Sequence, residues 1–396
     1  MYILLAFQIF SIRLNYLLGV AVLLRFILIF VFPNLSDDIY RFIWDGNLIH
    51  AGYNPYSLLP SDALALNISG NNQLLFNELN SPEYFTVYPP FAQAIFYFST
   101  AFSGDWATCS ILMKSTLFMA EIGSIALILK ILKQLNLEDH RVLIYALNPL
   151  ILIELLGNLH FEAFTVFFVL LAFYWTIKQK VLAAATSLAL GVCAKLLPLM
   201  LLPFIWNYFN KSKKLLAAFG VTCLLLFSPL FFGMHFSKFF QSVDLYFGKF
   251  EFNGGVYSLL RYIGFQLSGF NLIRFIGPLM AFITLAVMFR FFLKQRKANI
   301  HQLISFSFWS LTIYYLLSTT VHPWYLSLPL ALSLFLPFRF ILLWSFLIFF
   351  SYINYSYEPY AENLTVMFLE YLAVFGLIIY ETTIRKKALK EHLSHV

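Results

Sequence analysis

Long apolar runs separated by short polar breaks recur along the whole chain. A helix needs about 17 to 25 apolar residues to cross a bilayer, and about twelve runs are candidates for such helices. They lie near residues 14–32, 110–132, 141–157, 161–177, 181–194, 196–209, 214–232, 271–293, 301–318, 324–337, 339–355 and 363–380. The pattern predicts an all-α, polytopic membrane protein, a helical bundle of about twelve transmembrane helices.

A thirteenth apolar stretch, residues 87–103, decides on which side each loop lies. It begins with Tyr88-Pro89-Pro90, and the two prolines lack backbone donors and favour extended structure before a helix. If this stretch does not cross and the N-terminus is inside, most of the 26 Lys and Arg residues fall on the inner side, as the positive-inside rule requires. We therefore predict a juxtamembrane or re-entrant helix on the outer face, a large first outer loop at 33–109 and two cytoplasmic termini.

The composition agrees with this interpretation. The 396 residues are 61% hydrophobic, 19% aromatic and 11% charged, and the mean hydropathy is +0.78. Soluble domains have about a quarter charged residues, so a globular cytosolic enzyme, a disordered protein and a disulfide scaffold are excluded. The net charge of +7 records orientation in the membrane and gives no reason to expect a nucleic-acid partner. We expect a single transmembrane domain over 1–396, with a basic cytoplasmic tail at 381–396.

The first outer loop opens with two adjacent carboxylates, Asp37 and Asp38. Adjacent carboxylates raise one another's proton affinity, as partial burial also does, so one of the two is a candidate general base. The alternative is a solvated loop, or a cap on a helix that begins at Asp38. The residues that follow mix aromatic and charged side chains at helical spacing, which a solvated loop does not need: Tyr40, Arg41, Trp44 and Asp45.

Three strings in this loop resemble a known family. They are D-D-x-Y-R-x-x-W-D-G at 37–46, G-x-N-P-Y at 52–56 and S-P-E-Y-x-T-x-Y-P-P at 81–90. In this order they are similar to bacterial members of the GT-C superfamily of integral membrane glycosyltransferases, in particular the polyprenyl-phosphate-mannose-dependent mannosyltransferases. The resemblance extends over most of the chain, through Asn148-Pro149 and the segments 157–162, 194–198, 257–261 and 322–325.

The resemblance implies a GT-C-like fold and an inverting transfer of a hexose, mannose in the relatives. The donor would be a polyprenyl-phosphate sugar, the acceptor a lipid, glycan or protein, and the location the outer face of a bacterial inner (plasma) membrane. By position Asp37 would be the base, with Asp38 second. The matched positions, together with outer-face residues beside them, give the substrate-binding candidates Arg41, Trp44, Asp45, Tyr88, His160, Glu162, Lys195, Tyr257, Arg261, His322, Trp324 and Tyr325.

A phosphate leaving group needs cations, and few basic residues lie away from the inner side. Lys195 interrupts an apolar run where it reaches the outer face, a position at which Lys is more often functional than decorative; the alternative is snorkelling to the head groups. Arg261, on an expected outer amphipathic helix, is a second phosphate candidate, or else contacts anionic lipid. Arg41 can instead pair with Asp37 or Asp38 and fix their orientation.

Metal binding stays an open possibility. His160, Glu162 and His322 have no zinc-site spacing. Carboxylates at Asp37, Asp38 and Glu162 are the oxygen ligands that Mg²⁺ or Mn²⁺ prefers, and some relatives bind such a cation.

Aromatic residues at a later outer turn are candidates for the sugar pocket. His322, Trp324 and Tyr325 are expected to shape it, with Trp and Tyr stacking on a pyranose face. The alternative is an interfacial aromatic belt.

Two other functions remain open. A secondary transporter or lipid-linked sugar flippase would use ionisable groups within the membrane, and Lys114, Glu121 and Glu370 lie in apolar runs. Against it, the two halves of the chain show no inverted repeat. A ligase that moves whole lipid-linked oligosaccharides would share the chemistry but need a larger acceptor pocket. Glu154, also in an apolar run, lies close enough to the outer face to join the site.

Overall fold

The computed structural model describes residues 13–231, 250–357 and 361–384. Over these ranges the chain is helical, and the β pairing that the structure describes there is an isolated bridge between Phe252 and Thr320. This confirms the all-α prediction for the described part of the chain. The predicted basic tail lies outside the described residues from residue 385 onward.

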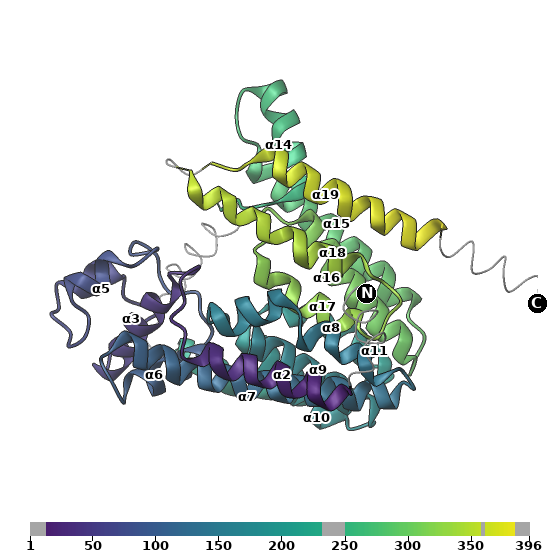
Figure 1. Ribbon diagram of the computed structural model, residues 1–396, viewed down its shortest axis with the longest axis horizontal. Helices are drawn as coiled ribbons and strands as arrows, with labels where there is room; N and C mark the ends of the chain where they lie inside the picture. Colours follow the sequence, from purple (N-terminus) through teal and green to yellow (C-terminus); the bar gives the residue numbers. More distant parts are fainter. Residues whose placement is uncertain (1–12, 232–249, 358–360, 385–396) are drawn as a thin grey trace, which may run out of the picture.

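Within the described ranges the elements follow one another as helices joined by loops and turns (Figure 1). They are α2 (Leu14–Ile29), α3 (Asp38–His50), α4 (Pro60–Leu64), α5 (Gln73–Asn77), α6 (Pro90–Thr100), α7 (Trp106–Gln134), η1 (Asp139–Val142), α8 (Leu143–Ala146), η2 (Ile151–Gly157), α9 (Glu162–Ile177), α10 (Val181–Ala194), η3 (Leu197–Leu201), α11 (Leu202–Tyr208), α12 (Lys213–Phe231), α14 (Gly255–Ser268), α15 (Ile273–Lys294), α16 (Ile300–Leu317), η4 (Pro323–Leu326), α17 (Ser327–Ser333), α18 (Phe340–Leu347), η5 (Ile348–Ser356), α19 (Leu364–Ile379) and η6 (Tyr380–Ile384).

Among the described residues, four helices are long and apolar enough to cross a membrane alone. They are α7, residues Lys213–Leu230 of α12, α15, and Leu364–Thr383 of α19 and η6. A bent pair, Asp139–Ala146 and Ile151–Gly157, makes a fifth if it counts as one span. Several other predicted spans correspond to shorter apolar helices, such as α2, α9 and α10. The membrane class is therefore supported, whereas the number twelve is not confirmed.

Prolines explain where predicted spans are broken. The two helices of the bent pair meet at 57°, and Asn148-Pro149 lies between them. Pro149 has no N–H to continue the helix, and it restricts the residue before it. Pro198 lies in the first turn of η3, after α10 has ended at Ala194, and the predicted span 196–209 consists of the 3₁₀ helix η3 followed by α11.

The first outer loop folds into α3, α4, α5 and α6. Helix α3 packs against α6, with the rings of Phe42 and Phe96 stacked at 4.4 Å. Pro90 is in the first turn of α6, which has 11 residues. At 1.5 Å per residue α6 is about 17 Å long, well short of the roughly 30 Å hydrocarbon core. This length suits a helix that does not cross.

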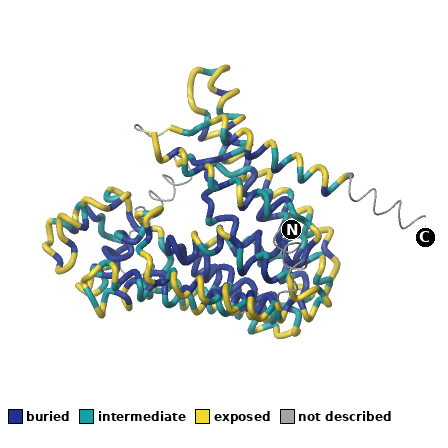
Figure 2. Tube along the Cα trace, viewed as in Figure 1, coloured by how far each residue is buried: buried dark blue, intermediate teal, exposed yellow. Residues whose placement is uncertain are grey.

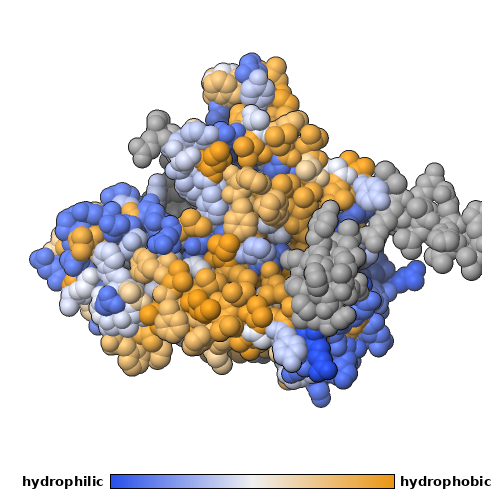
Figure 3. All heavy atoms as spheres, viewed as in Figure 1, coloured by the Kyte–Doolittle hydropathy of each residue, from blue (hydrophilic) through white to orange (hydrophobic). Residues whose placement is uncertain are grey.

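The bundle helices carry the apolar surface. Helices α2, α7, α9 and α10 pack together, and their inward faces are buried (Figure 2). In the same view, hydrophobic atoms cover the middle of the molecule, while hydrophilic surface lies over the first outer loop at the left and over the opposite end of these helices (Figure 3). The first outer loop therefore extends beyond one end of the apolar surface.

Two buried cations join α2 to the bundle. Arg25 donates to Glu121 Oε2 at 3.1 and 3.0 Å and to the Ala146 carbonyl at 2.6 Å, and Tyr145 donates to Glu121 Oε1 at 2.5 Å. Lys114 donates to carbonyl oxygens at the ends of two helices: Leu28 in the last turn of α2, Val31 just after it, and Gly157 at the end of η2. Glu121 and Lys114 thus have structural partners.

Candidate functional site

The carboxylate pair lies where the chain leaves α2 and enters α3. Asp37 is the residue before α3, and its side chain makes no capping hydrogen bond. Asp38, by contrast, accepts a hydrogen bond from Asn80 Nδ2 at 3.2 Å and one from the Tyr88 hydroxyl. Asp37 is exposed and Asp38 is half-buried. The structure therefore holds Asp38 in place and leaves Asp37 accessible.

The electrostatics of the pair favour proton uptake by Asp37. Partial burial and the neighbouring charge of Asp38 raise the pKa of the Asp37 carboxyl above its usual value. Burial also raises the pKa of Tyr88 well above its usual value, with a further contribution from Asp38. Tyr88 therefore stays protonated and donates to Asp38. Asp38 thus has Tyr88 as a neutral hydrogen-bond donor, and the carboxylate of Asp37 beside it has a raised proton affinity. This arrangement suits general-base chemistry by Asp37.

Residues from the C-terminal part of the chain approach this pair. Tyr355, in η5, is 54% exposed and lies within reach of the charges of Asp37, Asp38 and Glu154. Tyr352, one turn earlier, donates to both oxygens of Glu154, at 2.9 and 3.0 Å. The site is thus built by segments more than 300 residues apart.

Glu154 lies in η2, a π-helical segment of a kind often found at functional sites. Its Oε2 accepts from Asn158 at 3.1 Å and lies 3.4 Å from His160 Nε2. Leu159, between these two residues, has φ 64°, a left-handed conformation that is costly for a bulky side chain. The surrounding structure therefore holds this turn in place and fixes the position of His160.

A column of rings extends from His160. The rings of His160 and His322 lie 3.7 and 4.4 Å from that of Trp324, at 23° and 3°. Two imidazoles side by side on one face could not both come so close, so they cover opposite faces of the indole. Phe252 stacks on His322 at 4.5 Å, and Tyr355 stacks on Phe252 at 5.4 Å. Protein rings thus cover Trp324 on both faces, so this packing leaves no free indole face for the sugar that Trp324 was expected to stack on.

His322 is a neutral member of this column. It is 7% exposed, and its Nδ1 has no hydrogen-bond partner within the described residues. Burial, with the nearby charges of His160 and Lys195, lowers the pKa of His322 to about 3. His322 is therefore uncharged at neutral pH and is packed between the rings of Trp324 and Phe252.

Lys195 follows the last residue of α10, where a cation is favoured by the helix dipole. Its ammonium pairs with Glu162, the first residue of α9, and lies 4.1 Å from the ring centre of Tyr325. Tyr325 is 9% exposed, so its ring is covered rather than offered to a sugar. The Lys195 side chain is 32% exposed, which leaves its charge accessible to a ligand.

Arg41, Trp44 and Asp45 lie in the interior of the first outer loop. Arg41 Nε donates to Asp45 at 2.9 Å, and its Nη1 donates to the carbonyls of Ser81 and Tyr84. Trp44 is fully buried. The pairing of Arg41 with Asp37 or Asp38 is thus wrong, because Asp45 one helical turn away takes the guanidinium. These three residues hold the loop together.

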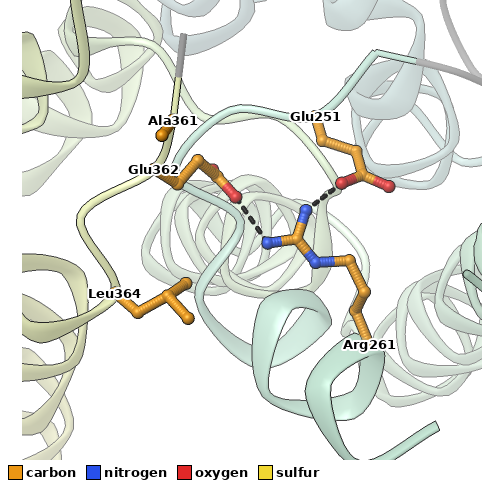
Figure 4. A pocket seen from close by; sticks show the side chains of 5 residues that line it. All are labelled: Glu251, Arg261, Ala361, Glu362 and Leu364. Atoms are coloured by element: carbon orange, nitrogen blue, oxygen red, sulfur yellow. Dashed lines mark hydrogen bonds and ion pairs between the residues drawn. The ribbon is translucent and has the colours of Figure 1, made fainter. Parts of the chain in front are cut away.

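Tyr257 and Arg261, on α14, form a separate cluster beside a cavity of about 270 Å³ (Figure 4). Arg261 pairs with Glu251 through Nη1 and with Glu362 through Nη2, the latter at 2.6 Å. Tyr257 donates to Glu251 at 2.5 Å. These carboxylates raise the pKa of Arg261. A phosphate would have to displace a carboxylate to reach the guanidinium.

Metal binding finds no support in the geometry. Among the described residues, no group of three or more His, Cys, Asp or Glu side chains could hold a metal ion. Glu162 is engaged by Lys195 and does not join Asp37 and Asp38 in such a group.

Several site residues were missing from the sequence-based set. They are Asn80, Tyr352, Tyr355, Phe252, Glu251 and Glu362. The tyrosine-rich run YINYSY at 352–357 was a detectable signal for two of them. The others are single polar or aromatic residues whose partners are distant in sequence.

The fold and the site define a helical membrane protein with acid–base groups and a lysine gathered near one end of its bundle. Residues 6–210, just over half of the chain, match the family model of the alpha-(1->6)-mannopyranosyltransferase N-terminal domain, and the chain belongs to this family. It is accordingly a glycosyltransferase of the mannosyltransferase type. The match includes Asp37, Glu154 and Lys195, whereas Arg261 and Trp324 lie beyond it. No curated protein matches the chain.

Proposed function

We propose that the protein transfers a mannosyl residue from a polyprenyl-phosphate donor to a lipid, glycan or protein acceptor at the outer membrane face, with Asp37 as general base. The observation that carries this proposal is that the two carboxylates of the pair have different environments. Asp38 accepts hydrogen bonds from Asn80 and Tyr88. Asp37 is exposed, its side chain makes no capping hydrogen bond, and its pKa is raised.

The proposed reaction is a single displacement with inversion. The acceptor oxygen forms a bond to the anomeric carbon while its proton passes to a carboxylate oxygen of Asp37. The bond between that carbon and the phosphate oxygen breaks, and its electron pair leaves with polyprenyl phosphate. One carboxylate is sufficient for an inverting displacement, and Asp38 nearby eases the positive charge that develops on the sugar.

Lys195 is the cation best suited to the leaving phosphate. Its side chain is partly exposed, and Glu162 and Tyr325 orient it without enclosing it. Arg261 has two carboxylate partners already. A charge-assisted hydrogen bond from Lys195 would stabilise the negative charge that grows on the phosphate during transfer.

For the membrane arrangement we propose twelve spans in a bacterial inner membrane, with both termini cytoplasmic and the site outside. The short α6 supports a first outer loop that does not cross. The hydrophilic surface over that loop, beyond the apolar middle of the molecule, supports it as well (Figure 3). Shorter and broken helices such as α2, α9 and the bent pair would supply the remaining spans.

The transporter alternative gains nothing from the structure. Lys114 and Glu121 were its intramembrane charges, and both have partners that join helices. Glu370 likewise accepts hydrogen bonds from Trp344 at 2.9 Å and from Asn253. Groups engaged in this way act as structural links in the bundle.

The decisive test is a transfer assay with labelled polyprenyl-phosphate mannose and candidate acceptors. Wild-type protein should form product, and Asp37→Asn should reduce kcat by about 10²- to 10⁴-fold, the usual contribution of a general base. Asp62→Asn, an exposed carboxylate of the same loop, is the matched control and should retain activity. Full activity in Asp37→Asn would overturn the assignment of the base. Sugar flux across the membrane of proteoliposomes, without any mannosyl transfer, would overturn the proposed enzymatic function.

A further inference from the structure

A hollow between α14 and the start of α19 lies outside the site described above. Glu251, Arg261, Ala361, Glu362 and Leu364 line this cavity of about 270 Å³ (Figure 4). Arg261 lies between the two carboxylates, and dashed lines in the figure mark both ion pairs. The volume is near the lower end of that of ligand pockets, about 300 Å³, which suits a ligand of one or two rings.

The carboxylates of this cavity are firmly positioned. Glu251 accepts hydrogen bonds from Tyr257 at 2.5 Å and from Asn271 at 2.6 Å. Glu362 accepts from the Asn253 backbone N–H at 2.8 Å. Tyr371 of α19 in turn donates to the Asn253 carbonyl at 2.7 Å. A ligand would therefore meet groups that are already ordered, which lowers the entropy lost on binding.

The charges of the lining disfavour both phosphate and a metal cation. Two carboxylates and one guanidinium leave a net charge of −1, so a phosphate would be repelled and would have to break an existing ion pair. A metal cation would meet the guanidinium between the two carboxylates. A neutral ligand rich in hydroxyl groups fits all three side chains, because each hydroxyl can donate to a carboxylate and accept from Arg261.

The cavity is connected to the candidate active site. Glu251 precedes Phe252, whose ring stacks on both His322 and Tyr355. Tyr355 in turn lies within reach of the charges of Asp37 and Asp38. Neither of these aspartates lines the cavity, and α14 and α3 lie well apart in Figure 1. A sugar in the cavity is therefore not the one that reacts.

We propose that this cavity binds a sugar unit of the acceptor at a distance from its reacting hydroxyl, so that the acceptor is a glycan of several units. The assignment of this sugar to an acceptor rests on the proposed function. The cavity then acts as a distal acceptor subsite, which favours longer glycans over short ones.

The test compares two acceptors in purified full-length protein, a monomannoside and a tetramannoside with the same aglycone. Ala361→Trp fills the cavity without touching its charges, and Glu362→Gln removes one charge at constant shape. We expect both variants to raise KM for the tetramannoside about tenfold, as expected from lost hydrogen bonds to charged groups. KM for the monomannoside and for the donor should stay constant. Glu83→Gln, an exposed carboxylate of the first outer loop, should change neither value.

Calorimetry with the tetramannoside alone separates this inference from the proposed function. Loss of tetramannoside binding in Ala361→Trp would support the subsite even if wild-type protein transferred no mannose, a result that would overturn the proposed function instead. Unchanged tetramannoside KM and binding in both variants would overturn the subsite. Displacement of the tetramannoside by millimolar inorganic phosphate would also overturn it, since the cavity would then be an anion site. Thermal unfolding of each variant confirms that the protein is folded.

Discussion

The imidazole of His160 stacks on the indole of Trp324, with ring centroids 3.7 Å apart. His160 belongs to the part of the chain that matches the mannopyranosyltransferase domain, and Trp324 lies beyond it. Because His160 also contacts Glu154, the stack connects the C-terminal half to the carboxylates of the site. The family-matched region is therefore not structurally independent of the rest of the chain.

Replacement of Trp324 should therefore affect activity as well as stability. Trp324→Leu removes the shared partner of His160 and His322, and stacking of this kind contributes about 0.5 to 1.5 kcal/mol per pair. We expect a lower unfolding temperature and a fall in kcat/KM of about tenfold, with most of both restored in Trp324→Phe. Unchanged kcat/KM in a destabilised Trp324→Leu protein would show that the stack has no role at the site.

The pH profile of transfer should report the carboxylate pair. Asp37 acts as a base only when ionised, and its pKa is raised by burial and by the charge of Asp38. Activity should therefore fall as the pH falls through this raised pKa. Asp38→Asn removes the repelling charge, lowers the pKa of Asp37 and should shift the acid limb of kcat/KM to lower pH. Asp62→Asn should leave the acid limb of kcat/KM at the same pH. An acid limb that stays at the same pH or moves to higher pH in Asp38→Asn would refute the electrostatic coupling between Asp37 and Asp38.

Some of this site was accessible from the sequence, for definite physical reasons. The carboxylate pair and the short helix after Pro89-Pro90 are local features, set by adjacent charges and by proline geometry. The Arg41–Asp45 pair is equally local, since residues four apart on a helix face one another, but Arg41 was expected to pair with Asp37 or Asp38 instead. The tyrosine-rich run at 352–357 was visible in the sequence, but its distance along the chain gave no sign that Tyr355 comes within reach of the charges of Asp37 and Asp38.

Other features depend on tertiary packing that no local pattern encodes. Trp324 was expected to face a sugar, but two histidines from separate turns cover its faces. Arg261 was expected to bind phosphate, but Glu251 and Glu362 approach it from residues 10 and 101 positions away. Charged residues that the sequence suggests are free for a ligand often pair with other charged side chains of a membrane protein, because an unpaired buried charge is costly.

Lys114 should position the segments that lead to the site. Its ammonium donates to carbonyls at the ends of α2 and η2, which precede Asp37 and His160 in the chain. Lys114→Met leaves those carbonyls without their donor, at about 1 to 3 kcal/mol, so we expect a lower unfolding temperature and reduced kcat with little change in donor KM. Lys130→Met, exposed on the same helix, is the control. Full kcat in Lys114→Met would limit Lys114 to a stabilising role.

The buried Arg25–Glu121 pair gives a prediction for stability alone. Both side chains are fully buried, and Glu121→Ala would leave the guanidinium without its counter-charge at a cost of about 3 to 5 kcal/mol. Unfolding in mild detergent should show this loss, whereas the double variant Arg25→Met, Glu121→Leu should recover much of it because no lone charge remains. A double variant no more stable than Glu121→Ala would contradict this account.

Cysteine accessibility can test the orientation of the chain. Helix α7 has 29 residues, about 43 Å at 1.5 Å per residue, and exposed Asp105 and Glu138 flank it. With both termini inside, a membrane-impermeant maleimide should label Asp105→Cys in intact cells and Glu138→Cys only after permeabilisation. The unsubstituted protein gives the background, since Cys109 and Cys193 are buried and Cys223 is half-buried. Labelling of both positions from the same side would refute a crossing by α7, and with it the placement of Asp37 on the outer face.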